Sequence, residues 1–169
     1  DGYAHEAALE AGLITEAVFG CGIDRIYPPM NTGLANRILA AGGALISEYP
    51  VGTSPDRYHF PARNRIIAGL AQGTMVVEAG DKSGALITAA LALDYNRDVL
   101  AVPGAVTNPN SRGCHALIRH VAALVETAED ILDAMELRGK GRKTELTEQM
   151  ALSLSATETA IVQALDASE

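Results

Sequence analysis

Short apolar runs alternate with longer amphipathic stretches along most of this chain. The apolar runs are rich in β-branched residues and too short to show a polar face, which is typical of strands buried on both sides. The amphipathic stretches have the periodicity of helices with one apolar face. The pattern predicts strands at 15–19, 44–47, 74–78, 98–102 and 123–126, and helices at 3–11, 32–41, 63–72, 85–95, 113–119 and 128–137.

This order of strands and helices predicts an α/β fold in which a parallel sheet, wound like a Rossmann sheet, is covered by helices. Ligands of such sheets bind at the carboxyl ends of the strands. Binding residues are therefore expected in the loops that follow residues 19, 78 and 102.

Composition agrees with a folded domain plus a short appendage, because the 169 residues are 48% hydrophobic and 20% charged. Cys21 and Cys114 are far apart and form no CxxC pair. We therefore expect neither a disulfide framework nor a structural zinc site, and a reducing cytoplasm as the compartment. No stretch approaches the roughly 18 apolar residues that a membrane span needs, so no membrane partner is expected. The chain opens at Asp1 without Met, which predicts that native sequence is missing upstream.

A change of composition after residue 137 predicts a domain boundary. Residues 1–137 are expected to form one domain, and the basic and polar stretch 138–153 a linker. In the last segment, 154–169, Ser155 precedes Glu158 by three residues, a capping-box signal ahead of an amphipathic helix. A single helix cannot bury itself, so this one is expected to begin a second small domain, or to pack on the first domain or on a partner.

The loop after the first predicted strand carries Gly20 and Gly22, the first two glycines of a GxGxxG dinucleotide motif. Arg25 stands at the third glycine position, and Pro28 and Pro29 would stop the helix that should hold a pyrophosphate. We therefore favour a tight turn that needs the backbone freedom of glycine.

The loop after the third predicted strand, residues 79–84, suits a phosphate better. Backbone amides, the Lys82 ammonium and the Ser83 hydroxyl converge where a helix is expected to begin near Gly84. Amides at a helix N-terminus donate to anions, and lysine adds a full positive charge. The Walker A spacing is absent, and the alternative is an ordinary strand-to-helix turn capped by serine.

Arg63, Asn64 and Arg65 cluster at the expected start of another helix. Arginine at a helix N-terminus opposes the macrodipole, so helix stability does not account for the two arginines. An anionic ligand would account for them. Internal pairing of one arginine with Glu48 or Glu78 is the alternative.

Candidate catalytic groups are sparse. The loop at 103–115 supplies proline and glycine for a close approach, with polar side chains beyond. Cys114 has no base partner in the sequence and is expected to be buried. His59 and His115 are expected to be surface or hydrogen-bonded histidines. No Ser/His/Asp order, paired carboxylates or metal cluster stands out, so we predict no catalytic residue, no metal and no cofactor.

The net charge of −8 excludes a protein that coats DNA with its whole surface. The charge is uneven, however. Residues 1–56 and 120–137 each carry a net −5, whereas residues 57–119 hold seven basic and four acidic side chains, a net +3. The positive segment contains the lysine and arginine loops, which favours a local anion groove on an acidic body.

Several multi-residue motifs resemble the DNA processing protein A family (DprA, also called Smf), in order and over residues 1 to about 135. They are DGYAHEAAL from Asp1, GCGIDRIYPPMN from Gly20, ISEYP from Ile46, FPARNRIIAG from Phe60, EA at Glu78 followed by KSG at Lys82, AVPG from Ala101 and GCHALI from Gly113.

The resemblance implies an extended Rossmann-like fold that binds single-stranded DNA, forms homodimers and loads the RecA recombinase onto incoming strands during natural transformation, without catalytic turnover. Carried over by position, it places seven residues in the DNA groove, with Phe60 as a stacking or packing residue. They are Phe60, Arg63, Asn64, Arg65, Lys82, Ser83 and Gly84. Amides and cations that hold phosphates tolerate any base sequence.

The chain also departs from the family pattern. The family's SGxARGI stretch would precede Asp1, Glu16 interrupts a usually apolar strand, and Val121 replaces a usual glycine. The helix expected from Leu154 is similar to the start of a small winged-helix-like C-terminal module, which the chain does not complete.

Two other function classes remain alternatives. One is a nucleotide-processing hydrolase related to the lysine-decarboxylase-like phosphoribohydrolases, although Thr88 stands where their general acid/base glutamate would be. The other is a sensor that binds a nucleotide as ligand.

Overall fold

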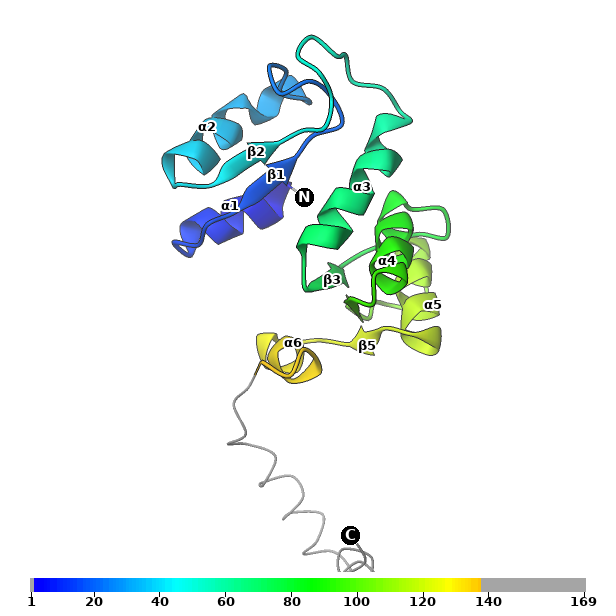
Figure 1. Ribbon diagram of the computed structural model, residues 1–169. Helices are drawn as coiled ribbons and strands as arrows, with labels where there is room; N and C mark the ends of the chain where they lie inside the picture. Colours follow the sequence, from blue (N-terminus) through cyan, green and yellow to red (C-terminus); the bar gives the residue numbers. More distant parts are fainter. Residues whose placement is uncertain (1, 138–169) are drawn as a thin grey trace, which may run out of the picture. The chain divides into compact units, whose positions relative to one another are not determined.

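The computed structural model describes residues 2–137 (Figure 1). Contacts divide the chain into two units, Asp1–Thr127 and Ala128–Glu169. The predicted linker at 138–153 and the predicted helix at 154–169 lie outside the described residues. The domain boundaries expected from the sequence therefore stay predictions.

Every strand and helix predicted within the described residues is present, with bounds that differ by a few residues. The strands are β1 Glu16–Val18, β2 Ala44–Ile46, β3 Gly73–Val76, β4 Asp98–Ala101 and β5 Ala123–Leu124. The helices are α1 Gly2–Glu10, α2 Thr32–Ala40, α3 His59–Leu70, α4 Gly84–Asp94, α5 Arg112–His120 and α6 Ala128–Ala134. Two short 3-10 helices, η1 Pro29–Asn31 and η2 Pro109–Ser111, begin with proline, whose missing N–H is harmless at a first helical position.

The strands form two parallel sheets. β1 pairs with β2, and the second sheet has the order β3-β4-β5. Among the described residues β1 and β3 each have a single neighbouring strand, and residues of both line a groove of about 980 Å³. The predicted α/β class, with parallel strands flanked by helices, is confirmed. The division into two sheets was not predicted by the pattern.

The core beside the second sheet is built from small side chains. Ala68 of α3, Ala89 and Ala92 of α4, Ala101 of β4 and Cys114 of α5 have no exposed surface. Alanine lets helices approach each other and the sheet closely, and α3 and α4 lie side by side in Figure 1. Cys114 is buried as expected.

α3 begins at His59, four residues before the predicted start. Pro61 therefore falls in the first turn, where an N–H would have no partner within the helix. This shift places Arg63 and Arg65 in the second turn. Because the effect of the macrodipole falls off within the first turn, the expected conflict of these arginines with it does not arise.

Candidate functional site

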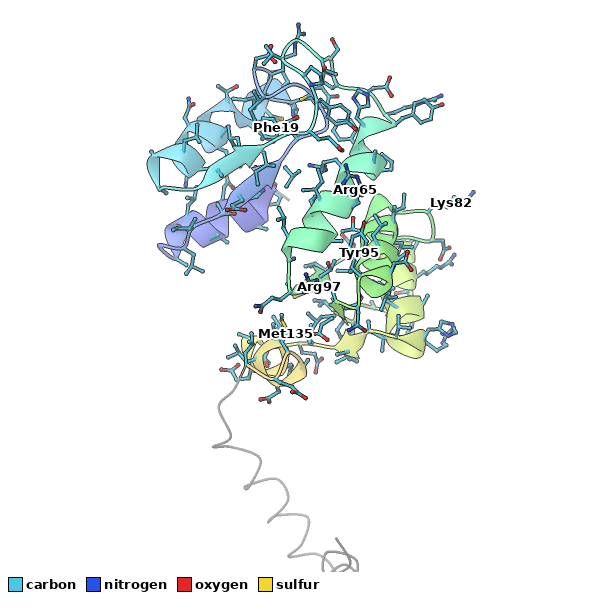
Figure 2. The ribbon with its side chains drawn as sticks, viewed as in Figure 1. Phe19, Arg65, Lys82, Tyr95, Arg97 and Met135 are labelled. Atoms are coloured by element: carbon cyan, nitrogen blue, oxygen red, sulfur yellow. The ribbon has the colours of Figure 1, made fainter. Side chains whose placement is uncertain are left out.

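The loop between β3 and α4 has the features expected of an anion site. Ser83 caps α4, and its hydroxyl accepts a hydrogen bond from the amide of Ala85 (3.3 Å). The amide of Ser83 donates to the carbonyl of Gly80 (3.0 Å), which closes the turn. Lys82 is exposed and points away from the ribbon in Figure 2. Among the described residues its ammonium forms no ion pair.

A second loop completes this site. The amide of Ala79 donates to the carbonyl of Asn110, and the amide of Gly113 donates to the carbonyl of Ala79, both at 2.8 Å. Together the two loops form a shallow pocket of about 420 Å³ that is open to solvent. It is lined by Glu78, Ala79, Gly80, Lys82, Ser83 and Asn110. We call it the Lys82 pocket.

The charges at the Lys82 pocket are of both signs. The Glu78 carboxylate accepts a hydrogen bond from the Asn108 side-chain amide (3.3 Å). Arg112 lies 3.7 Å from Asp81, and both side chains are about two-thirds exposed. An exposed pair of this kind contributes little to stability. Sequence reasoning named the loop at 103–115, which carries Asn108 and Asn110, but selected neither as a binding residue. The adjacent, parallel β3 and β4, whose carboxyl ends meet, bring this loop to the pocket.

The two arginines of α3 have partners within the protein. The Arg63 guanidinium donates through Nη1 to the carbonyl of Val18, the last residue of β1. The Arg65 guanidinium pairs with the Glu48 carboxylate. This is the internal pairing of one arginine that the sequence offered as the alternative to an anionic ligand. Desolvation by burial lowers the pKa of Arg63, but an arginine remains charged at neutral pH.

The remaining predicted binding residues lie along one groove. Phe60, Arg63 and Asn64 of α3 and Gly84 of α4 all line the 980 Å³ groove that β1 and β3 flank. Lys82 and Ser83 line the Lys82 pocket instead. Six of the seven predicted residues thus line either this groove or the Lys82 pocket, and Arg65 lines neither.

An exposed aromatic–cation pair precedes α3. The Arg57 guanidinium lies 4.6 Å from the centre of the Tyr58 ring and donates to its hydroxyl (2.5 Å). Two-thirds of Tyr58 is exposed. The sequence showed Arg57 only as one of seven cations, and the neighbouring aromatic residue was the signal for this pair.

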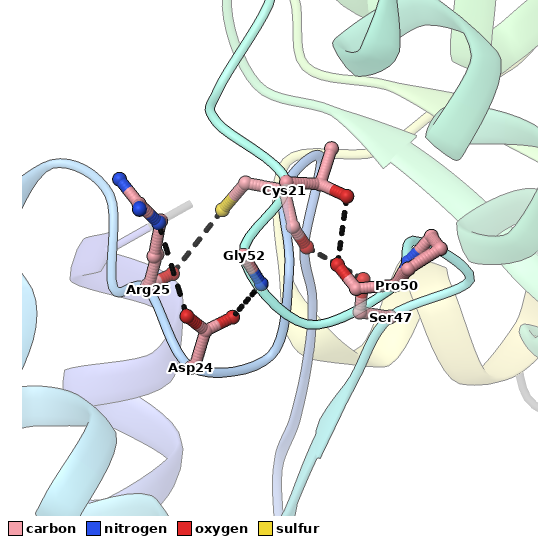
Figure 3. Close-up of polar contacts among 7 residues, drawn as sticks. Cys21, Asp24, Arg25, Ser47, Pro50 and Gly52 are labelled. Carbon is pink, nitrogen blue, oxygen red and sulfur yellow. Dashed lines mark hydrogen bonds and ion pairs between the residues drawn. The ribbon is translucent and has the colours of Figure 1, made fainter.

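The glycine turn after β1 is held by hydrogen bonds within the protein. Neither Gly20 nor Gly22 has a positive φ, so the backbone freedom expected from the sequence is not the reason for glycine here. Ser47 donates to the carbonyl of Cys21 (2.6 Å), and the Asp24 carboxylate accepts from the amide of Gly52 (2.8 Å), as Figure 3 shows. A Cβ on Gly22 would lie 2.7 Å from the Pro50 carbonyl oxygen, so glycine is required there. The chain then passes through η1, so the turn does not lead directly into a helix as a dinucleotide motif would. The first residue of α3 contacts the turn instead, with His59 Nδ1 3.1 Å from the carbonyl oxygen of Gly20.

The cysteine thiols and the residues that could bind a metal are the remaining candidates for chemistry. Burial raises the pKa of both thiols, Cys21 and Cys114, so neither is an activated nucleophile at neutral pH. Within residues 2–137 no cluster of three or more His, Cys, Asp or Glu could hold a metal, and no helix is long and apolar enough to cross a bilayer.

The arrangement therefore offers an exposed cation over a helix N-terminus, beside a helix that carries two more cations. In comparison with known proteins, the family model of DNA recombination-mediator protein A matches residues 1–136. The chain belongs to this family.

Individual DprA and Smf proteins are similar over the same part. Protein Smf of Escherichia coli is 47% identical over 136 residues, which cover 80% of this chain and 36% of that protein. DNA processing protein DprA of Streptococcus pneumoniae is 46% identical over 136 residues, 80% of this chain and 48% of that protein. The chain thus spans between a third and a half of the length of these relatives.

Two solved DprA structures share the fold. The structure of Streptococcus pneumoniae DprA superposes with a TM-score of 0.72 at 45% sequence identity. The alignment covers 79% of this chain and 47% of the Streptococcus pneumoniae chain. That of Helicobacter pylori DprA, which concerns the single-stranded DNA binding mode of that protein, gives 0.65 at 27% identity and covers 73% of this chain and 56% of its own.

Proposed function

We propose that this DprA-family protein binds single-stranded DNA, protects it and loads RecA onto it during natural transformation, as a cytoplasmic homodimer without catalytic turnover. Membership of a recombination-mediator family supports the role. The binding mode described for the Helicobacter pylori relative supports the ligand.

The observation that carries the proposal is the Lys82 pocket. Lys82 is exposed, unpaired among the described residues, and set beside the capped N-terminus of an eleven-residue helix. Cations and backbone amides hold phosphate oxygens without reading bases. Such a site suits a ligand that is a phosphate chain of any sequence.

The proposed DNA path continues from this pocket to α3. Gly84 and Asn64 line the same groove, so a strand held at Lys82 and Ser83 has polar neighbours on both helices. Arg65 lies at the surface, with about half of its side chain exposed beside Glu48. The remaining members of the proposed path are Phe60 and Arg63.

The test is a titration of a fluorescent single-stranded oligonucleotide at several salt concentrations. Lys82→Glu should weaken binding about thirtyfold for all sequences alike, because a charged hydrogen bond is worth about 2 kcal/mol. It should also lower the salt slope by about 0.7, the value for one phosphate on a single strand. Arg37→Glu makes the same charge change on α2 and is the control. Equal affinity of Lys82→Glu and the wild type would contradict the proposal.

The other parts of the proposal have separate measurements. Light scattering of the protein as it elutes from a size-exclusion column tests whether it is a homodimer. Capture of purified RecA by the immobilised protein tests whether RecA is a partner. Chromatography of nucleoside monophosphates after incubation with the protein tests turnover. We expect no base release, because Glu78, the carboxylate of the Lys82 pocket, is hydrogen-bonded to Asn108 and no second carboxylate lines the pocket within the described residues.

A further inference from the structure

Arg63 links two parts of the molecule that are distant in sequence. Its hydrogen bond to the Val18 carbonyl joins the second turn of α3 to the end of β1 across 45 residues. Its guanidinium carbon also lies 5.9 Å from the centre of the Phe60 ring, within reach of a cation–π contact. One side chain thus holds both the strand end and the aromatic ring.

The Phe60 ring is confined on two further sides. Tyr27 contacts it with ring centres 5.9 Å apart and planes tilted by 41°. A Cβ on Gly20 would come within 3.1 Å of Phe60 Cδ1, so the ring lies directly on the backbone of the glycine turn. The position of Phe60 therefore depends on Arg63, Tyr27 and the absence of a side chain at residue 20.

Arg63 is poorly placed to bind a phosphate itself. Its side chain is half-buried, and Nε is buried with no hydrogen-bond partner among the described residues. To reach an exposed phosphate, the guanidinium would have to leave the Val18 carbonyl, which would then lose this donor. Within residues 2–137 Lys82 is exposed and has no ion pair that it would have to break.

We infer that Arg63 is a positioning residue for DNA binding: it fixes the Phe60 ring, on which a base stacks, and it does not contact phosphate. The inference rests on the proposed function and refines it. A stacked base adds affinity that does not depend on salt, whereas each phosphate contact adds to the salt slope.

The test measures both affinity and salt slope for matched variants. Arg63→Gln should weaken oligonucleotide binding about tenfold at every salt concentration, as should Phe60→Leu, because one stacked base is lost. The salt slope should stay at the wild-type value in both. The double variant should bind no more weakly than either single variant, because both changes remove the same contact.

Arg63→Lys separates the two roles further. Lysine keeps the charge by which a phosphate contact adds to the salt slope, but it lacks the planar guanidinium that can stack on Phe60 and donate to the Val18 carbonyl at once. We therefore expect Arg63→Lys to bind as weakly as Arg63→Gln. A salt slope lowered by about 0.7 in Arg63→Gln, with recovery in Arg63→Lys, would overturn the inference.

A further variant covers the case in which Arg63 substitutions unfold the protein. Gly20→Ala moves the Phe60 ring without a change of charge, so it should also weaken binding at an unchanged salt slope. Wild-type affinity in Gly20→Ala, with the ring displaced as judged by a shift in its NMR resonances, would overturn the inference. Absence of binding by the wild type would instead overturn the proposed function.

Discussion

The N-terminal half of α3 and the loop before α4 both present cations where the sequence suggests a phosphate, yet they use them differently. On α3, Arg63 bonds to the Val18 carbonyl and Arg65 to the Glu48 carboxylate. At α4, Lys82 is exposed without an acidic partner among the described residues. The α3 arginines are bound to groups of the protein, whereas Lys82 is open to a ligand.

The difference follows from the side chains and their surroundings. A guanidinium has five donors in a planar fork and suits carbonyl, carboxylate and phosphate oxygens alike, whereas an ammonium is a compact, strongly hydrated charge. α3 faces the end of β1 and the loop after β2, which offer such acceptors. A count of positive charges along the sequence cannot distinguish the two uses.

The largest effect is expected from a change that disrupts the scaffold of Lys82, the two hydrogen-bonded loops that form its pocket. A Cβ on Gly113 would lie 2.7 Å from the Ala79 carbonyl oxygen and 3.1 Å from that of Gly80. Because these are backbone atoms, Gly113→Ala must push the two loops of the Lys82 pocket apart. We expect a loss of about 2 kcal/mol in the free energy of unfolding, measured by urea titration.

The same variant tests the comparison through DNA binding. If Lys82 depends on the scaffold, Gly113→Ala should also lower the salt slope towards that of Lys82→Glu. Gly33→Ala on α2, where an added Cβ meets nothing within 4 Å, is the control. A Gly113→Ala protein of wild-type stability would show that the two loops move independently of each other.

A smaller effect is expected from the cap of α4. Ser83→Ala removes the acceptor of the Ala85 amide, which costs about 1 kcal/mol of unfolding free energy. Ser83→Thr keeps the acceptor and should retain most of that stability. Thermal unfolding of both variants measures the difference, and equal melting temperatures would mean that Ser83 does not stabilise the helix start.

Much of the fold was predictable because it depends on local pattern. The helical and strand periodicities located each α-helix and strand of residues 2–137, though not the two 3-10 helices, and the loops at the strand ends included the Lys82 pocket. The start of α3 was predicted four residues late; the helix begins before Pro61, which lies in the first turn, where a proline loses no hydrogen bond.

The partners of the arginines were less predictable because they are not local. Glu48 lies 17 residues from Arg65 and was named as one of two candidate partners. Val18 lies 45 residues from Arg63, and its carbonyl carries no charge that would identify it as a partner from the sequence. A backbone carbonyl is present at every residue, so only the packing of α3 on β1 selects this one. The division into two sheets is likewise a matter of long-range pairing.

The smallest effect is expected from a change that frees Arg65, so that α3 would carry an unpaired cation as the loop before α4 does. Glu48→Gln removes the charge that holds Arg65 while keeping a similar shape. Since about half of the Arg65 side chain and a third of Glu48 are exposed, the loss of unfolding free energy should be under about 1 kcal/mol. The released arginine should strengthen oligonucleotide binding about two- to threefold and raise the salt slope by up to about 0.7.

Two matched proteins show whether Arg65 is responsible for this gain. Glu10→Gln makes the same charge change at an exposed site on α1 and measures the effect of net charge alone. Glu48→Gln combined with Arg65→Ala should lose the gain entirely. If affinity rises equally in Glu10→Gln, the gain is a general effect of net charge, and α3 would then contact DNA through groups other than Arg65.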